Sequence, residues 1–382
     1  MVSQYLTEAQ LLKFELMDKG IVLSDAAIAA LTDLNRNRSL SPHDYASTSG
    51  VILNLDDDVW VNAPIELYNP NFVSRTPYVL DFDGGFSVEG AGLASAAGFW
   101  PQPEYHGSSL DFGPLNNYVV THGDRARLSP VRSCSMTCTF CNIPYDDPIS
   151  DYALKPVDAI VSAAKIAVDD PLQPARHMLI SGGTPKPKDI PWMQELYATV
   201  LEAFPGTQVD LMMVPLPGLF DLPRLASLGL HELSINIELF NRDRARDYMR
   251  NKFNQGLDFY LDFIESATDE LGPGRARSML MVGLETMEDT LAGVRAIAER
   301  GGTPVLSPFR PDMSTPLKNE KPPSAEFMRE TFERAREIVS EFGVFLGPDC
   351  PPCSHNTLNF ATGVDGHVIY PHDRPLMLGA AG

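Results

Sequence analysis

The sequence has no long apolar run, a shortage of basic residues and few cysteines. No apolar segment is long enough to span a bilayer, and the N-terminus, Met1-Val2-Ser3-Gln4, has no signal-peptide pattern. The 30 basic residues are outnumbered by 50 acidic ones, and the net charge of −20 argues against a nucleic-acid groove and against binding to an anionic membrane. Five cysteines, an odd number in 382 residues, do not suggest a disulfide framework. We therefore expect a reduced, cytoplasmic protein with no nucleic-acid or membrane partner.

The composition indicates a globular protein, and its N-terminal part is predicted to contain both helices and strands (α+β). Apolar residues make up 44% and charged residues 21% of the chain, which is enough to bury a large core. Residues 3–35 contain two predicted helices, at 8–18 and 25–35. Short strands are predicted at 51–55, 59–61 and 78–82, separated by Asp, Pro and Gly. This N-terminal extension, residues 1–124, is predicted to shield one side of the site.

From residue 125 onward, strands alternate with helices. Strands are predicted at 126–131, 177–180, 208–214, 232–237, 277–282 and 304–306, and helices at 156–168, 191–203, 222–228, 253–271 and 287–300. Six such units in series predict an α/β fold with a partial (β/α)6 barrel of the TIM type over residues 125–317. A last helix at 324–342 begins a C-terminal part, residues 318–382, that closes the barrel. Active sites on such barrels lie at the C-terminal ends of the strands.

Three cysteines, Cys134, Cys138 and Cys141, lie within eight residues directly after the first predicted strand. Reduced thiols at this density indicate a metal site or redox chemistry. Three thiolates can ligate three irons of a four-iron cluster and leave the fourth iron open to a small molecule. The alternative, a structural zinc loop, usually needs a second pair of Cys or His at a regular distance, and the other two cysteines lie about two hundred residues downstream.

The motif Cys134-x3-Cys138-x2-Cys141, with the aromatic Phe140 before the last cysteine, resembles the cluster loop of radical S-adenosylmethionine (SAM) enzymes. The resemblance implies that the three thiolates hold a [4Fe-4S] cluster and that SAM binds its open iron. It also implies that the reduced cluster cleaves SAM to a 5'-deoxyadenosyl radical. The resemblance covers about residues 125–317 well and 318–360 loosely, and its last strand and loop resemble the biotin-synthase-like branch.

Further segments appear in the order that the family shows, and the resemblance implies SAM contacts in each. The turn after the second strand resembles the Gly-Gly-Glu segment that holds the methionine amino group, with Thr184 in place of the acid; its residues are Ser181, Gly182, Gly183 and Thr184. Asn236 and Glu238, at the end of the fourth strand, correspond to polar residues that meet the ribose and the methionine end of SAM. Val282 and Gly283, at the end of the fifth strand, resemble the adenine-binding segment.

The last candidates lie at the sixth strand and in the tail. Arg310, at a strand end, is a candidate anion or substrate contact. Cys350 and Cys353 form a Cys-x2-Cys pair that, with His355 and Asp349, would be a poor set for a second cluster and an awkward one for zinc. A redox pair, a thiol that gives a hydrogen atom to a product radical, and a structural turn are the other interpretations. We expect this segment near the barrel mouth, so Arg310, Cys350 and Cys353 are the candidate catalytic residues.

These features predict a radical SAM enzyme that abstracts hydrogen from a small-molecule substrate, in natural-product or cofactor biosynthesis. A flavodoxin- or ferredoxin-type protein would supply the electron. The first alternative is a sulfur- or carbon-insertion enzyme of the biotin-synthase type, which needs an auxiliary cluster. The second is a non-catalytic iron–sulfur or zinc protein.

Overall fold

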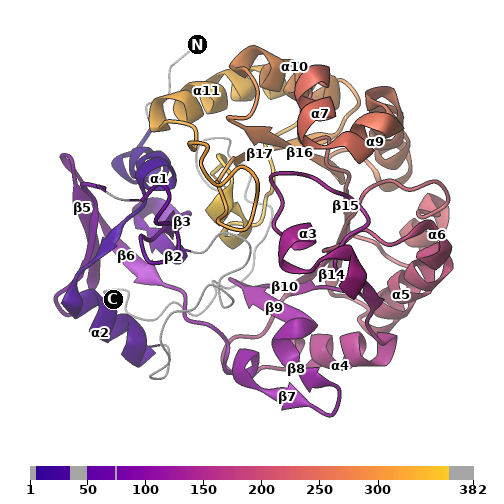
Figure 1. The fold of residues 1–382 in the computed structure, drawn as a ribbon, viewed down its shortest axis with the longest axis horizontal. Helices are drawn as coiled ribbons and strands as arrows, with labels where there is room; N and C mark the ends of the chain where they lie inside the picture. Colours follow the sequence, from indigo (N-terminus) through magenta and orange to yellow (C-terminus); the bar gives the residue numbers. More distant parts are fainter. Residues whose placement is uncertain (1–5, 35–49, 74, 361–382) are drawn as a thin grey trace.

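Six parallel strands form the central sheet of the structure, a computed structural model that describes residues 6–34, 50–73 and 75–360. The strands are hydrogen-bonded in chain order: β10 (Arg125–Leu128), β13 (His177–Ile180), β14 (Gln208–Met212), β15 (Glu232–Ser234), β16 (Ala276–Val282) and β17 (Thr303–Pro308). β9 (Val119–His122) adds an antiparallel strand at the β10 edge. The sheet curls into a half-barrel (Figure 1), which confirms the predicted partial barrel.

The first barrel strand is shorter than predicted. β10 ends at Leu128, and β11 (Val131–Arg132) leaves the sheet to pair with β12 (Ala153–Leu154). Pro130 lies between the two segments and has no backbone N–H to continue a ladder. The chain therefore turns away from the sheet just before the cysteine loop.

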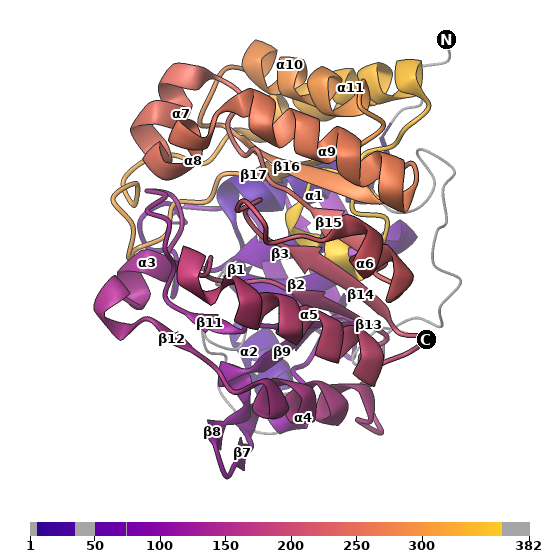
Figure 2. The same cartoon turned by 90° about the vertical axis from the view of Figure 1, so that its right-hand side faces the viewer.

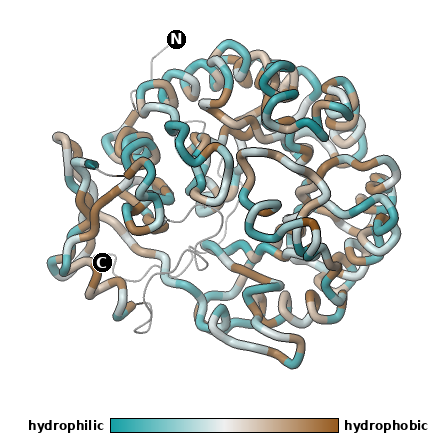
Figure 3. The backbone as a smooth tube through the Cα atoms, viewed as in Figure 1, coloured by the Kyte–Doolittle hydropathy of each residue, from teal (hydrophilic) through white to brown (hydrophobic). Residues whose placement is uncertain are grey.

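Helices cover the outer face of the half-barrel (Figure 2). They are α4 (Val157–Val168), α5 (Ile190–Ala203), α6 (Leu222–Ser227), α9 (Leu257–Leu271), α10 (Met287–Ala298) and α11 (Ala325–Phe342). Hydrophobic and hydrophilic stretches alternate along these helices (Figure 3), as expected for helices with one face on a core. None of the described helices combines the length and the apolar character needed to cross a lipid bilayer.

One predicted helix is broken in the structure. The segment predicted as a single helix at 253–271 is divided at Gly256, whose φ of 92° ends α8 (Arg250–Gln255) before α9 begins. Glycine adopts this left-handed conformation without a steric penalty.

A further helix, α7 (Arg242–Tyr248), precedes α8. α7 contacts the cysteine loop through Tyr248 O, which accepts from Thr139 N, and α8 contacts the segment after β15 through Lys252, whose Nζ donates to Asn236 O.

The N-terminal extension folds into a second sheet. Its strand order is β1 (Val22–Leu23), β4 (Val79–Phe82), β5 (Phe86–Gly90), β6 (Leu93–Phe99), β2 (Gly50–Leu55) and β3 (Val59–Pro64). Two helices accompany it, α1 (Glu8–Lys19) and α2 (Asp25–Leu34). Thr7 starts α1 with a capping box, in which Gln10 N donates to Thr7 Oγ1 at 3.3 Å and Thr7 N donates to Gln10 Oε1 at 3.0 Å.

Short elements make up the connections. They are β7 (Ser109–Leu110), β8 (Gly113–Pro114), α3 (Ile143–Asp146) and the 3-10 turns at Asp56–Asp58, Glu104–Gly107, Leu115–Asn117, Ile149–Asp151, Pro187–Asp189 and Pro352–Asn356.

The C-terminal segment 343–360 joins the half-barrel to the N-terminal extension. Gly347 bridges Val305 of β17, and Leu358 N donates to Leu306 O at 2.9 Å. On the other side, Lys13 Nζ of α1 donates to the carbonyl oxygens of Ser354 at 2.8 Å and Asn359 at 2.9 Å. The segment therefore lies between β17 and α1.

An aromatic cluster seals the same junction. The rings of Phe14 in α1, Phe332 in α11 and Phe360 in the tail lie 5.1 to 5.9 Å apart, centroid to centroid. Aromatic pairs at these distances add stability beyond the area that they bury.

Candidate active site

A cavity of about 850 Å³ opens at the C-terminal edge of the barrel sheet, which we call the mouth. Its wall comes from the cysteine loop, the turn after β13, the segments after β14 and β15, and Met279 of β16. This volume is in the range of small-molecule sites. The sheet thus brings together residues that are far apart in the sequence.

The cysteine loop is held from two sides by backbone hydrogen bonds. Thr184 N donates to Cys134 Sγ at 3.2 Å, and Ser135 N donates to Thr184 O at 3.0 Å. On the other side, Thr139 N donates to Tyr248 O at 2.8 Å. The loop is therefore fixed between the β13 turn and the end of α7.

All three thiols of the loop are unbonded to other cysteines and line the cavity. Burial raises the pKa of Cys138 far above its usual range, and the carboxylate of Glu238 raises it further. Burial also raises the pKa of Cys141, to about 12, although a backbone hydrogen bond from Ile143 acts in the opposite direction. Phe140, which lies between these two cysteines in the sequence, is buried and also lines the cavity.

The glycine turn after β13 packs directly on the cysteine loop. A Cβ atom at Gly183 would lie 1.6 Å from Ser133 O, so only glycine fits there. Gly182 has φ of +133°, a conformation that other residues rarely adopt. Ser181, Gly182, Gly183 and Thr184 all line the cavity. The two glycines let the backbone approach both the cysteine loop and a ligand in the cavity.

A buried ion pair forms the opposite wall. Lys252 Nζ of α8 lies 3.0 Å from Glu238 Oε1 and donates to Asn236 O at 3.1 Å. Burial disfavours the charge of Lys252, but the groups around it, Glu238 first and then Tyr260 and Cys138, together outweigh burial and raise the pKa of Lys252. Glu238 itself has φ of 65°, which is strained for a residue with a side chain. Its Oε2 is buried and has no hydrogen-bond partner among the described residues.

Asn236 is fixed beside this pair. Its Oδ1 accepts hydrogen bonds from Ser234 Oγ at 2.9 Å and from Met279 N at 3.2 Å. The predicted residues Asn236 and Glu238 therefore lie together at the mouth with the three cysteines, as the alternation of polar residues after β15 suggests.

Two basic residues of the cavity were not predicted. Arg127 points inward from β10, and its buried Nε has no hydrogen-bond partner in the described part of the chain. Lys155 lines the same end of the cavity and donates to Asn117 O. Burial, followed by the nearby charge of Arg127, lowers the pKa of Lys155 to about 8. The signal for Arg127 was its alternation with the apolar Ala126 and Leu128 in a strand that ends at the mouth.

Lys252 was also missed, because it lies just before the helix predicted at 253–271. In the structure it belongs to α8, and a lysine on a short polar helix carries no sequence signal of its own.

Three predicted residues lie outside the cavity wall. Val282 and Gly283 end β16 beyond Met279, and a Cβ at Gly283 would meet the ring of Pro323 at 2.9 Å. Arg310 is turned toward the N-terminal extension, where its guanidinium donates to Asn62 Oδ1 at 3.2 Å and to Asn62 O at 2.8 Å. Burial lowers the pKa of Arg310 to about 9. This arginine joins the two sheets instead of facing the three cysteines.

The expectation that Cys350 and Cys353 lie near the mouth is wrong. The two residues form a disulfide below the opposite edge of the sheet, and Cys353 Sγ lies 3.3 Å from Nε2 of His177, the first residue of β13. The glycine turn of the mouth follows the last residue of β13, so the length of the strand, about 3.3 Å per residue, separates the two sites. The sequence could not show this, because a tail segment can reach either end of a barrel.

The middle of the chain, residues 128–297, matches the family model of the radical SAM superfamily. The match contains the cysteine loop, the glycine turn, Glu238 and Lys252, all of which line the mouth. This part of the chain is a radical SAM domain. The cofactors of this class are a [4Fe-4S] cluster and SAM, and the alternative of a non-catalytic zinc or iron–sulfur protein is set aside.

Several solved radical SAM structures resemble this radical SAM enzyme in fold. HydG from Carboxydothermus hydrogenoformans, a maturase of FeFe-hydrogenase, is 16% identical, with 66% of this chain and 62% of that chain covered and a TM-score of 0.46. A radical SAM methyltransferase from Sphaerobacter thermophilus is 14% identical, with 71% and 76% covered and a TM-score of 0.45. Another HydG structure is covered over 49% of its length, so the chain spans about half of that relative.

SuiB from Streptococcus suis is 11% identical, with 62% of this chain and 52% of that chain covered and a TM-score of 0.45. No curated protein sequence matches the chain. At these identities and TM-scores the similarities support no argument about activity, and the assignment to the superfamily depends on the match of residues 128–297.

The residues of the mouth fit the cofactors of the class. Three unbonded thiols in one loop suit a cluster that keeps one iron open, because each thiolate ligates one iron. The unpartnered Glu238 Oε2 is an acceptor aimed at a ligand with N–H or O–H groups, such as the amino and ribose groups of SAM. Because the two glycines of the turn have no side chains, such a ligand can approach the backbone N–H and C=O groups closely.

Proposed function

We propose that this radical SAM enzyme abstracts a hydrogen atom from a small anionic substrate bound in the mouth cavity. The observation that carries the proposal is that one cavity joins three free thiols, an unpartnered buried carboxylate oxygen and two basic residues. Each of these groups suits a different component: the cluster, SAM and the substrate.

In this proposal Cys134, Cys138 and Cys141 hold the cluster. When the cluster and SAM are bound, they supply a 5'-deoxyadenosyl radical as the hydrogen acceptor. The protein positions the cluster ligands and shields them from water. Thr184 and Tyr248 fix the cysteine loop by hydrogen bonds, and the apolar Phe140 lies beside the ligands. Such burial excludes water from a reactive species.

Glu238, Asn236 and the glycine turn are the proposed SAM contacts. Lys252 pairs with Glu238: the Lys252 ammonium lies 3.0 Å from Oε1 and leaves Oε2 as an acceptor. Ser181, Gly182, Gly183 and Thr184 lie across the cavity and offer backbone groups to the methionine end. Val282 and Gly283, predicted from the resemblance, lie outside the cavity wall and are not part of this proposal.

Arg127 and Lys155 indicate an anionic substrate. Both line one end of the cavity, and the Arg127 guanidinium has no acidic partner there among the described residues. A buried guanidinium without a counter-ion is costly, and a carboxylate or phosphate would compensate it with a bidentate hydrogen bond. The substrate class is therefore a small carboxylate or phosphate.

Sulfur insertion is less well supported, because the second cysteine pair lies at the other end of the barrel. The electron for SAM cleavage would come from a flavodoxin- or ferredoxin-type protein in the cytoplasm, and the pathway would be biosynthetic. We also propose that residues 125–317 are the catalytic unit, flanked by an extension over 1–124 and a closing tail over 318–382.

The test uses the full chain, reconstituted anaerobically with iron and sulfide and reduced with dithionite. We expect 5'-deoxyadenosine from SAM, and we expect fractions of small anionic metabolites to accelerate its formation. Arg127→Gln should lower the kcat/KM for the stimulating fraction by about 10- to 100-fold, since a hydrogen bond to a charged group contributes about 1.5–3 kcal/mol.

Lys188→Gln is the matched control for charge, because Lys188 lies in the turn at Pro187–Asp189 outside the cavity wall. Stimulation by neutral metabolites alone, or equal stimulation of the Arg127→Gln variant, would contradict the anionic substrate class. Neither result would contradict the proposed cleavage of SAM.

A further inference from the structure

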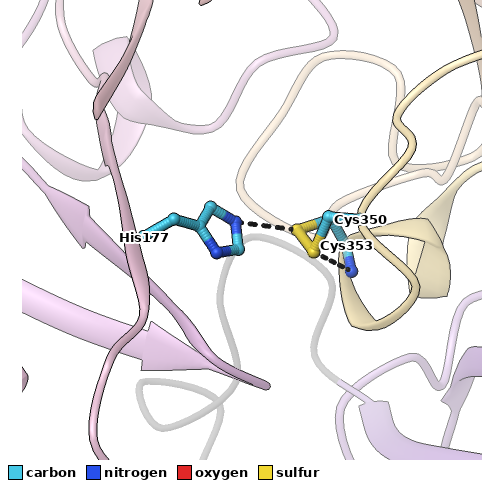
Figure 4. Close-up of side chains that lie close together, drawn as sticks. All are labelled: His177, Cys350 and Cys353. Carbon is cyan, nitrogen blue, oxygen red and sulfur yellow. Dashed lines mark hydrogen bonds between the residues drawn. A yellow bond between two sulfur atoms is a disulfide. The ribbon is translucent and has the colours of Figure 1, made fainter. Parts of the chain in front are cut away.

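Three donor groups meet at the N-terminal edge of the barrel sheet, which we call the base. His177 Nε2 lies 3.3 Å from Cys353 Sγ, and Cys353 is bonded to Cys350 (Figure 4). One ligand atom from each of the three residues lies within 4.8 Å of the others. Donors this close suit one ion, whereas a four-iron cluster spreads its ligands over separate irons.

The donors come from separate parts of the chain and are all buried. His177 begins β13, and Cys350 and Cys353 belong to the C-terminal segment. Their exposed fractions are 2%, 4% and 3%, respectively. A disulfide requires no imidazole beside it. A histidine that converges on both sulfurs from another element is the arrangement of a metal site.

A carboxylate lies near the second nitrogen of the imidazole. Asp124 Oδ1 lies 3.6 Å from His177 Nδ1 and 3.8 Å from Cys350 Sγ. Metal-binding histidines commonly place a carboxylate on the second ring nitrogen, which fixes the tautomer and the direction of the ligating nitrogen. Cys353 N also donates to Cys350 Sγ at 3.3 Å, which would stabilise a thiolate.

We propose that Cys350, Cys353 and His177 bind one zinc ion at the base when the disulfide is reduced, with Asp124 orienting His177. The fourth ligand is the oxygen of a water. Two sulfurs, one nitrogen and one oxygen in a tetrahedron are a ligand set typical of zinc. Neither His355 nor Asp349, the neighbours in sequence, belongs to this set: His355 Nδ1 faces Pro352 O at 2.6 Å.

Reduction of the disulfide before zinc binds requires a reductant, and a dithiol can supply the electrons. The dithiol gives two electrons and two protons to the Cys350–Cys353 disulfide and becomes a disulfide itself. Zinc binding then releases the two thiol protons, because the ligands are thiolates. The ion would tie the tail to the start of β13, while the same tail is bonded to β17 through Gly347 and Leu358. It would therefore fasten the two sides of the half-barrel at the base.

A second group of possible donors at the base, Asp210, His231 and Glu232, is less suitable. Arg277 lies between the two carboxylates, with its Nη2 3.0 Å from Asp210 Oδ2 and its Nε 2.8 Å from Glu232 Oε2. The guanidinium already supplies the positive charge that these acids need.

The experiment measures zinc in the full chain, purified anaerobically with dithiothreitol and supplied with zinc chloride. We expect one zinc per chain besides the iron of the mouth. X-ray absorption at the zinc edge should show two sulfur neighbours at about 2.3 Å and two nitrogen or oxygen neighbours at about 2.0 Å. This measurement on the unmodified protein does not depend on the folding of a variant.

Variants locate the ion. Cys350→Ser and His177→Ala should remove the bound zinc, and Asp124→Asn should weaken zinc affinity by about 10- to 100-fold. His355→Gln is the matched control, because it changes a buried histidine of the same segment and should keep the zinc. The triple Cys134→Ala, Cys138→Ala, Cys141→Ala variant should lose iron and keep zinc, which separates this proposal from the proposed function.

Three results would overturn the proposal. The first is no zinc in the reduced protein, with two titratable thiols at Cys350 and Cys353. The second is zinc that survives Cys350→Ser or disappears with His231→Gln. The third is iron in place of zinc at the base.

Discussion

The mouth and the base of the barrel both contain cysteines, but the groups around them differ. At the mouth, three unbonded thiols line a cavity together with backbone glycines and with polar atoms that have no partner among the described residues, Glu238 Oε2 and Arg127 Nε. At the base, two cysteines are joined to each other, and the charges of Asp210, Glu232 and Arg277 meet one another. The mouth has groups that need a ligand, and the base has groups that largely satisfy each other.

This difference follows from the direction of the strands. In a parallel barrel the chain leaves each strand at the C-terminal edge through a loop, so loop residues can converge on a ligand. The opposite edge holds the strand starts and here receives the tail. The role of a cysteine motif therefore depends on whether it lies at the C-terminal or the N-terminal edge of the sheet. Cys-x2-Cys spacing alone does not distinguish a catalytic site from a structural one.

The largest expected effect is the loss of the cluster at the mouth. Cys138→Ala should abolish 5'-deoxyadenosine formation and reduce bound iron to background, because one of three ligands in the loop is gone. The fold should persist, since the barrel core does not depend on this loop; circular dichroism and thermal unfolding check this. Retention of full iron content by the variant would contradict the assignment of the loop.

A smaller effect is expected from the ion pair of the mouth. Lys252→Met leaves the Glu238 carboxylate buried and unpaired, which should lower the free energy of unfolding by about 3–5 kcal/mol. Adding Glu238→Gln to it should recover most of this stability but not SAM affinity. Urea unfolding and equilibrium binding of SAM separate the two quantities. If the double variant also recovered SAM affinity, Glu238 would not be a SAM contact.

The glycine turn should show a steric effect on the cysteine loop. Gly183→Ala places a methyl group where Ser133 O now lies, at 1.6 Å, so the loop must move. We expect a loss of about 1–3 kcal/mol in unfolding free energy and a lower iron content after reconstitution. Gly206→Ala is the control for iron content, because its φ of +85° also strains an alanine, but no atoms lie near its Cβ position and it does not line the cavity. Equal iron content in both variants would show that the loop tolerates the shift.

The smallest effect concerns the tail near the base. Lys13→Met removes the donor to the carbonyl oxygens of Ser354 and Asn359, which should cost about 1–3 kcal/mol of unfolding free energy. Lys19→Met is the control on the same helix and should cost about 0.5 kcal/mol or less, because Lys19 makes a solvent-accessible pair with Glu15 and its Nζ lies 6.0 Å from the centroid of the Tyr78 ring. Urea unfolding measures both. A Lys13→Met loss no larger than the control would mean that the tail is held by its apolar contacts alone.

Much of the fold follows from local sequence patterns. The strand at His177–Ile180 and the helix at Val157–Val168 have strong periodicity, and the structure places both within a residue of the prediction. The break at Gly256 and the bounds of the helix Arg242–Tyr248 were missed, because a polar surface helix has little apolar periodicity. The pairing of β5 and β6 was missed as well, since contacts of the front sheet are not encoded in short motifs.

The site was predictable where a motif carried it. The cysteine loop, the glycine turn, Asn236 and Glu238 converge on one cavity, as parallel strands require. Arg127 was missed although it alternates with apolar residues in a strand, and Lys252 was missed because one basic residue in a short polar helix has no signature until its surroundings are known. Arg310, Cys350 and Cys353 were assigned to the mouth because position in the sequence cannot tell at which end of a barrel a tail packs.

The central claim is that the mouth holds the radical SAM centre and that it is independent of the base. The most direct measurement is anaerobic reconstitution of the full chain and of the Cys350→Ser, Cys353→Ser double variant, with iron, sulfide and zinc counts and SAM cleavage in dithionite. The account predicts about four irons per chain in both proteins, zinc only in the unmodified one, and 5'-deoxyadenosine from both. About eight irons in the unmodified protein that fall to four in the variant would place a second cluster at the base and contradict the account.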